Sequence, residues 1–260
     1  MLLSPRDVEA IERATVAALA PRIVVEDDRW LIAIDDGRIS RANSVTPLAA
    51  GADLLDAKLS RAEAAYAGAG LPPAFRVPDR PVFDALRGRL GDRGYEPHQP
   101  TLVQVCTVQR LLDGLDVAPG EISDVTGKAW AAAFGGEGFD PVDAASRVRA
   151  LSRSPGAVYG SVRDGGAVQA VGAMSFGLGW AGIHGMRTAM AFRGQGLAQR
   201  VLAALAREAR KRRVERVYLQ VERDNASARA LYARAGFTPA WEYAHWRPVR
   251  APDGASASGS

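Results

Sequence analysis

Hydrophobic and polar positions along this 260-residue chain follow two periods. Apolar residues spaced three or four positions apart predict helices, and short apolar runs bounded by Gly, Pro or Asp predict strands. The predicted helices cover residues 7–20, 53–68, 81–90, 123–134, 141–151, 196–211 and 226–235. The predicted strands cover residues 30–34, 38–45, 74–77, 101–109, 157–163, 167–176, 180–190, 216–221 and 240–247. Strands that alternate with helices in this order favour an α/β protein. We expect mixed sheets, of the α+β type, flanked by helices.

Two Asp- and Gly-containing turns are predicted to close β-hairpins. Asp35-Asp-Gly37 separates the first two predicted strands, and Asp164-Gly-Gly166 separates two strands of the second half. Short turns of this composition provide the backbone conformations with positive φ that tight hairpins require.

The loop at residues 193–198 lies between a predicted strand and the amphipathic helix 196–211. Its successive backbone N–H groups can point into one hollow, and the helix that follows adds the positive end of its dipole. Gly194 and Gly196 have no Cβ, so a ligand can approach the backbone closely. Such a loop suits an anion, best of all two closely spaced phosphates. The alternative is an ordinary strand–turn–helix joint that binds nothing. The spacing matches neither the P-loop nor Gly-x-Gly-x-x-Gly.

The two halves of the chain share an order of elements. Gly236-Phe-Thr-Pro239 follows Gly196 after 40 residues, and Gly94-Tyr-Glu-Pro97 follows Asp53 after 41 residues. Each motif then leads into an apolar strand. The first copy lacks the glycine loop, which predicts a degenerate half packed against a working half. We therefore expect domains at 1–114 and 115–250, followed by a disordered tail of small and polar residues at 251–260.

Composition and charge restrict the possible partners. Hydrophobic residues make up 47% and charged residues 24% of the chain, as in ordinary globular proteins. A formal net charge of +4 mildly favours anionic ligands but is too small to indicate nucleic-acid binding. Cys106 is the single cysteine, so an intrachain disulfide and a cysteine metal cluster are excluded. No signal-type or membrane-spanning apolar stretch occurs, and we expect a cytoplasmic protein with no metal, membrane or nucleic-acid partner.

Two motifs together resemble the GNAT acetyltransferase superfamily. Arg193-x-x-Gly196-x-Ala198 is similar to the family's pyrophosphate loop, Gln/Arg-x-x-Gly-x-Gly/Ala. About 30 residues later, the segment from Asn225 to Phe237 resembles the pattern Asn-x-x-Ala-x-x-x-Tyr-x-x-x-Gly-Phe. The resemblance covers residues 117–248 well. The first half is similar, more loosely, to the N-terminal part of two-part acetyltransferases.

The resemblance implies a GNAT acyl-CoA transferase fold in tandem with a degenerate GNAT-like half. In the family the glycine loop holds the pyrophosphate of acetyl-CoA, the asparagine contacts the CoA arm, and the tyrosine hydroxyl protonates the leaving thiolate. Carried over to this chain, the implied catalytic acid is Tyr232. The implied cofactor-binding residues are Met186, Arg187, Thr188, Arg193, Gly194, Gln195, Gly196, Leu197, Ala198, Gln199, Asn225 and Tyr232. The alternative for Asn225 and Tyr232 is a helix cap and a core aromatic residue.

The sequence does not identify the general base. Ribosomal-protein acetyltransferases of the family carry a glutamate at the position of Gln220, and glutamine cannot take up a proton. Glu137, in a glycine-rich loop, ranks first among the alternatives, ahead of His184 and Glu242. A solvated loop acid and a buried strand histidine are the structural explanations of the first two residues.

The sequence therefore favours an N-acetyltransferase that transfers the acetyl group of acetyl-CoA directly to a primary amine of a small molecule or peptide. Two alternatives stay open: a non-catalytic acyl-CoA-binding sensor or interaction module, and a transferase for a bulkier acyl-CoA. The partners implied are acetyl-CoA and the amine acceptor, whose identity is open, as is the oligomeric state.

Overall fold

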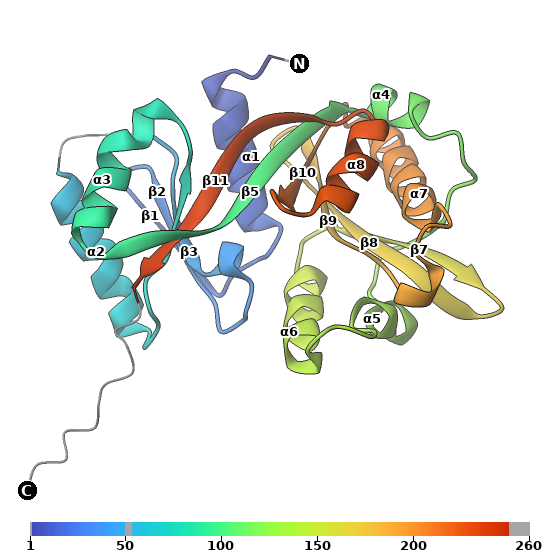
Figure 1. The fold of residues 1–260 in the computed structure, drawn as a ribbon, viewed down its shortest axis with the longest axis horizontal. Helices are drawn as coiled ribbons and strands as arrows, with labels where there is room; N and C mark the ends of the chain where they lie inside the picture. Colours follow the sequence, from blue (N-terminus) through green and yellow to red (C-terminus); the bar gives the residue numbers. More distant parts are fainter. Residues whose placement is uncertain (1, 50–53, 250–260) are drawn as a thin grey trace, which may run out of the picture.

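The computed structural model describes residues 2–49 and 54–249 as an eleven-stranded mixed sheet with helices on both faces (Figure 1). The strands are β1 (Ile23–Asp27), β2 (Trp30–Ile34), β3 (Ser44–Pro47), β4 (Phe75–Pro78), β5 (Tyr95–Thr107), β6 (Glu121–Ser123), β7 (Val158–Asp164), β8 (Ala167–Gly177), β9 (Trp180–Thr188), β10 (Arg216–Glu222) and β11 (Thr238–Pro248). The helices are α1 (Pro5–Ala17), α2 (Leu55–Gly68), α3 (Asp84–Asp92), α4 (Val108–Asp113), α5 (Lys128–Phe134), α6 (Pro141–Ser152), α7 (Leu197–Lys211) and α8 (Ala226–Arg234), with 3₁₀ turns η1 (Ser40–Ala42), η2 (Pro81–Phe83) and η3 (Met190–Phe192).

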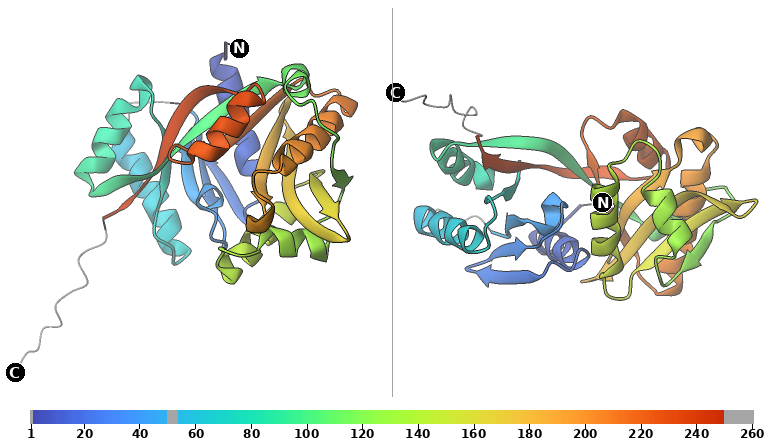
Figure 2. Two further views of the ribbon diagram at one scale, coloured as in Figure 1. Left: turned by 45° about the vertical axis from the view of Figure 1, so that its right-hand side comes forward. Right: turned by 90° about the horizontal axis from the view of Figure 1, so that it is seen from below.

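The order of strands across the sheet interleaves the two halves of the sequence. It runs β1-β2-β3-β4-β11-β5-β10-β9-β8-β7-β6. The last strand, β11, lies between β4 and β5 of the first half, and β5 in turn pairs with β10 of the second half. Figures 1 and 2 show β5 and β11 running side by side from the end of the molecule that contains α3 toward α4 and α8. Each half therefore completes the sheet of the other. The domain boundary at 114/115 stays a prediction, and the sheet contains strands from both sides of it.

Separate apolar clusters pack against the two ends of this sheet. Under α7 the cluster is built on Val201, Leu202 and Leu205, which are fully buried, as the helical spacing predicts. Residues of α2 and α3 form another cluster with β2, β3 and β4 at the opposite end (Figure 1). Helix α1 packs on the centre of the sheet, where Ile11 contacts a cluster that includes Trp180 and Tyr218. A helix of the first half thus covers strands of the second half.

The first hairpin differs from the prediction. It is formed by β1 and β2, and its turn is Asp28-Arg29, both with positive φ. The sequence pattern instead placed the turn at 35–37 and missed β1, which is an edge strand with four of its five residues exposed. Asp35 is buried, and its backbone N–H donates to Asn43 Oδ1 at 2.6 Å. The predicted strand 38–45 is wrong in its first part, because η1 precedes the short strand β3.

Two further segments correct the sequence-based prediction. Strand β5 begins six residues earlier than predicted, because Pro97 and Pro100 disfavour a strand in the sequence but are accommodated where β5 pairs only with β11. It ends at Thr107, whose side chain accepts from the Arg110 N–H and caps the unpredicted helix α4. The helix predicted over 123–134 begins only at Lys128, since residues 121–123 pair with β7 as β6. Helix 81–90 begins as η2. The predicted tail 251–260 lies outside the described residues.

No helix in residues 2–49 and 54–249 has the length and apolar character needed to cross a bilayer.

The strand pair β7–β8 and the helices α6, α7 and α8 agree with the prediction to within three residues at each end.

A buried ion pair joins α1 to the first-half strands. Arg76 Nη2 of β4 lies 2.5 Å from Glu12 Oε2 of α1, and both side chains are at most 3% exposed. Arg76 also donates to Thr46 Oγ1 at 3.2 Å, while Trp241 Nε1 of β11 donates to Glu12 Oε1 at 3.2 Å. The Arg76 guanidinium lies 5.1 Å from the centre of the Tyr243 ring. The pair thus connects α1, β3, β4 and β11 in the interior.

Arg76→Met is expected to lower the free energy of unfolding by about 3–5 kcal/mol, because it leaves the Glu12 carboxylate buried without its cation. Urea unfolding followed by circular dichroism measures the change. Arg163→Met serves as the matched control, since Arg163 pairs with Glu121 at the exposed edge of the sheet and its loss should change stability little. Equal effects of the two variants would contradict the structural role of the buried pair.

Candidate functional site

A gap opens in the sheet where two parallel strands diverge. β9 and β10 pair at only three positions, from Val217↔Ala181 to Leu219↔Ile183. Beyond these positions β9 continues along β8 alone, and β10 continues along β5 alone. Gaps at the carboxyl ends of parallel strands are the usual places for ligands in sheets flanked by helices.

A β-bulge at Gly185 produces this divergence locally. The register of β8 and β9 runs Ala173↔His184 and Val171↔Arg187, so that Gly185 and Met186 together oppose the single residue Gly172. A bulge of this kind bends the strand that carries the extra residue. Gly185 has φ +59°, and a Cβ there would lie 3.0 Å from carbon atoms of Leu151 and Phe134. Position 185 therefore requires glycine for both its conformation and its space.

The glycine loop leads from η3 into α7 with two left-handed residues. Gly194 has φ +78°, and Gly196, the N-terminal cap residue of α7, has φ +75°. No side chain caps this helix end, and among the described residues no hydrogen bond joins the N–H groups of Leu197 and Ala198 to a protein acceptor. Free N–H groups and the dipole of a 15-residue helix make this loop suited to an anion. The anion itself stays a prediction.

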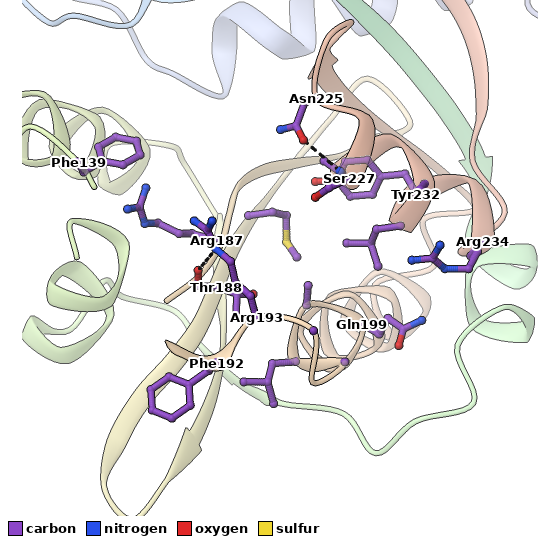
Figure 3. Close-up of a pocket in the computed structure, with 18 residues that line it drawn as sticks. Phe139, Arg187, Thr188, Phe192, Arg193, Gln199, Asn225, Ser227, Tyr232 and Arg234 are labelled. Atoms are coloured by element: carbon purple, nitrogen blue, oxygen red, sulfur yellow. Dashed lines mark hydrogen bonds between the residues drawn. The ribbon is translucent and has the colours of Figure 1, made fainter. Parts of the chain in front are cut away.

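A groove of about 800 Å³ connects this loop with α8 across the gap (Figure 3). All predicted cofactor-binding residues except Gln195 line it, which are Met186, Arg187, Thr188, Arg193, Gly194, Gly196, Leu197, Ala198, Gln199, Asn225 and Tyr232. The structure adds lining residues that were not predicted to bind the cofactor, namely Phe139, Phe192, Ser227, Arg234 and three residues of the second motif, Ala228, Ala230 and Leu231. Those on α8 share one helical face, so periodicity could have identified them. Phe139 carries no such signal, because a loop brings it to the groove.

Helix α8 positions the two residues of the second motif. The Asn225 side chain accepts from the Ala228 N–H at 3.1 Å and caps the helix, as its structural interpretation predicts, and it also lines the groove. Tyr232 lies two turns further along, packed edge-on against Phe237 with ring centres 5.9 Å apart. Burial raises the pKa of Tyr232 to about 12, so its hydroxyl carries a proton at neutral pH.

Comparison with known proteins identifies a family domain in residues 125–237. Residues 125–237 match the model of the acetyltransferase (GNAT) family. The chain carries a GNAT acetyltransferase domain. The match contains both sequence motifs, and together with the relatives below it supports acyl transfer from acyl-CoA.

The relatives extend this likeness over most of the chain. A Bacillus subtilis (strain 168) protein described as the uncharacterized N-acetyltransferase YobR is 27% identical over 250 residues, which are 94% of this chain and 99% of that protein. The structure of a GCN5-related N-acetyltransferase from Kribbella flavida is 18% identical, with a TM-score of 0.68, and covers 93% of this chain and 95% of its own. A tandem GNAT protein from the clavulanic acid biosynthesis pathway is 17% identical, with a TM-score of 0.62, and covers 97% and 98%. The predicted tandem GNAT fold is confirmed.

Arg187 holds the loop between α5 and α6 beside the groove of the GNAT domain. Its guanidinium lies 3.9 Å from the centre of the Phe139 ring, and it donates to the backbone oxygens of Gly136 (3.2 Å) and Glu137 (2.9 Å). Burial, with a smaller contribution from Arg193, lowers the pKa of Arg187. The Glu137 side chain is exposed and is not among those that line the groove. Its role as the base stays a prediction.

The other residues considered as the base lie outside the groove. His184 is buried with Nε2 2.8 Å from Ser175 Oγ, and burial, with a smaller contribution from Arg41, lowers its pKa to about 3. Glu242 Oε1 accepts from Arg223 Nη1 at 3.0 Å and lies in a different hollow. His184 is therefore neutral at pH 7, as expected for a buried strand histidine.

Both polar atoms of the Gln220 side chain make hydrogen bonds. Its Oε1 accepts from Arg41 Nη1 (2.7 Å) and from the Tyr243 hydroxyl (3.0 Å), and its Nε2 donates to Thr15 Oγ1 (3.0 Å). Thr15 and Arg41 belong to the first half of the chain, so Gln220 connects the two halves beside the gap. This connection uses the amide as both donor and acceptor, which a carboxylate could not do.

The raised pKa of Tyr232 can be tested directly by alkaline titration. We expect wild-type protein and Tyr232→Phe to show the same tyrosinate absorbance up to about pH 11 and to differ only above it, because burial disfavours the phenolate. Circular dichroism at each pH confirms that both proteins are folded. A difference already present near pH 10, the ordinary value for tyrosine, would contradict the burial of this hydroxyl.

Proposed function

We propose that the protein is an N-acetyltransferase that moves the acetyl group of acetyl-CoA to a primary amine. The observation that carries this proposal is the groove itself, which starts at the free N–H groups of the glycine loop and reaches the buried hydroxyl of Tyr232. The positions of Gly194 and Gly196 fit a pyrophosphate, since each lacks the Cβ that would stand in its way. We further propose that residues 115–250 form the catalytic unit and residues 1–114 the degenerate half.

Within this proposal, each part of the groove has a task. Bound acetyl-CoA supplies the activated thioester. The N–H groups of the glycine loop and the dipole of α7 bind its diphosphate and so orient it. Unpaired backbone N–H groups of β9 beyond the bulge can polarise the carbonyl, because β10 has diverged there.

The proton balance of the transfer assigns roles to two side chains. The acceptor nitrogen forms a bond to the carbonyl carbon as the bond from that carbon to sulfur breaks. Tyr232 donates its proton to the leaving sulfur, which suits a hydroxyl that burial keeps protonated. The nitrogen must lose a proton, and we propose Glu137 as its acceptor through water, on the loop that Arg187 fastens.

A non-catalytic acyl-CoA-binding module is the second function to consider. Gln220 favours this alternative, because its side chain cannot take up a proton. Both of its polar atoms already form hydrogen bonds to the first half of the chain. Release of free thiol from acetyl-CoA in the presence of a panel of primary amines separates the two functions. Binding of acetyl-CoA without thiol release for any amine would contradict the transferase and support the binding module.

Gly196→Glu is expected to abolish binding of acetyl-CoA, because the added carboxylate occupies and repels the anion site. Isothermal calorimetry should show at least about a 100-fold loss of affinity, as expected when a charge-assisted site is replaced by repulsion. Gly166→Glu is the matched control: Gly166 also has positive φ and open space around it, but lies in the β7–β8 turn. Equal affinity of both variants would refute the site.

Tyr232→Phe is expected to lower kcat by about 100-fold or more, the usual contribution of a positioned general acid, while leaving the affinity for acetyl-CoA nearly unchanged. The loss reflects a leaving thiolate without a proton donor. Steady-state rates of thiol release and calorimetry measure the two quantities. An unchanged kcat would remove Tyr232 from the acid role.

A further inference from the structure

A second cavity, of about 130 Å³, lies beside the gap on the sheet face opposite α7. In β10, Val217, Leu219 and Val221 belong to the cluster under α7, so the alternate residues Gln220 and Glu222 face the other way. Gln220 directly follows the last residue that pairs with β9. The cavity therefore begins where the two strands separate, and the groove with Tyr232 lies on the α7 face. Its lining residues are Ile39, Ser40, Arg41, Gln99, Thr101, Arg147, Gln220, Glu222, Tyr243 and His245.

The lining combines a cation with an unsatisfied polar atom. Arg41 of η1 donates to Gln220 Oε1, and among the described residues its guanidinium forms no ion pair with a carboxylate. His245 is 3% exposed, and its Nδ1 finds no hydrogen-bond partner in the described part of the chain. A buried polar atom without a partner costs free energy, which a ligand with a hydrogen-bonding group would recover.

The charges in the cavity are arranged for a small molecule with two opposite ends. Arg41 provides positive charge. Burial is the main cause of the lowered pKa of His184 and of His245, and the charge of Arg41 adds to both shifts. Glu222 provides a carboxylate on the same wall, at the exposed end of β10. A guanidinium binds a carboxylate with paired, charge-assisted hydrogen bonds, and a carboxylate attracts an ammonium group. The volume equals that of about four water molecules in the liquid, so only a small group fits.

We propose that this cavity receives the acceptor, that Arg41 binds a carboxylate of it, and that the acceptor is a free amino acid or a similar small amine with a carboxylate. This inference rests on the proposed acetyltransferase activity, because it names the substrate of the same site. It also assigns a task to the first half of the chain: Ser40 and Arg41 form one wall of the cavity, which β5 and β11 complete. The interleaving of strands from the two halves thus places Arg41, the proposed specificity-determining residue, beside the gap.

The test compares each standard amino acid with its α-carboxamide, which keeps the amine but lacks the negative charge. We expect wild-type protein to release thiol from acetyl-CoA faster with one or more amino acids than with the matching amides. Arg41→Gln should raise KM for those amino acids by at least about 100-fold with little change in kcat, and Arg41→Lys should recover part of the loss. Arg22→Gln, an exposed arginine of the same half that pairs with Asp36, is the control.

Calorimetry with the same amino acids, in the presence of CoA, separates failure of this inference from failure of the proposed function. If wild-type protein releases thiol with the amides as fast as with the acids, or Arg41→Gln keeps the preference, the carboxylate site is overturned and the transferase stands. If amino acids bind to wild-type protein but not to Arg41→Gln, and no thiol is released, the site stands and the transferase is overturned. Absence of both binding and release overturns both.

Discussion

The functional geometry of this protein depends on a short contact between two parallel strands. β9 and β10 share only three paired positions, and the bulge at Gly185 turns β9 away from its neighbour directly afterwards. A fully paired strand would close the sheet and use the backbone N–H groups that the gap leaves free. The bulge is possible because residue 185 has no side chain to collide with Leu151 and Phe134. The groove and the smaller polar cavity both exist because of this separation.

The second constraint is the exchange of strands between the halves. β11 lies between β4 and β5, and β5 lies beside β10, so neither half has a complete sheet without the other. The polar contacts follow this arrangement: Gln220 joins Thr15 and Arg41, and the buried pair of Glu12 and Arg76 connects α1 to the strands next to β11. A displacement of the two halves would leave a buried charge without its partner and would break the hydrogen bonds of the half-buried Gln220 amide.

Much of the second half could be predicted from residues that are close in sequence. The loop around Gly196 and the helix that begins after Asn225 identified most of the residues that line the groove, because each motif is a local element that begins at the groove. The first half was predicted less well. Its hairpin was assigned to the wrong turn, because an exposed edge strand has no alternation of buried and exposed residues and a buried Asp35 resembles a turn residue.

The sequence by itself determined the α/β class, the family of the second half, the glycine loop and the position of the candidate acid Tyr232. These follow from local periodicity and from motifs within one strand–helix unit, where chain geometry alone sets which residues are neighbours. Only the tertiary structure decided the interleaved sheet, the contact between Gln220 and Arg41, and the place of Phe139 beside the groove. Those depend on contacts between segments about 50 to 180 residues apart, which packing and long-range hydrogen bonds select and no local pattern encodes.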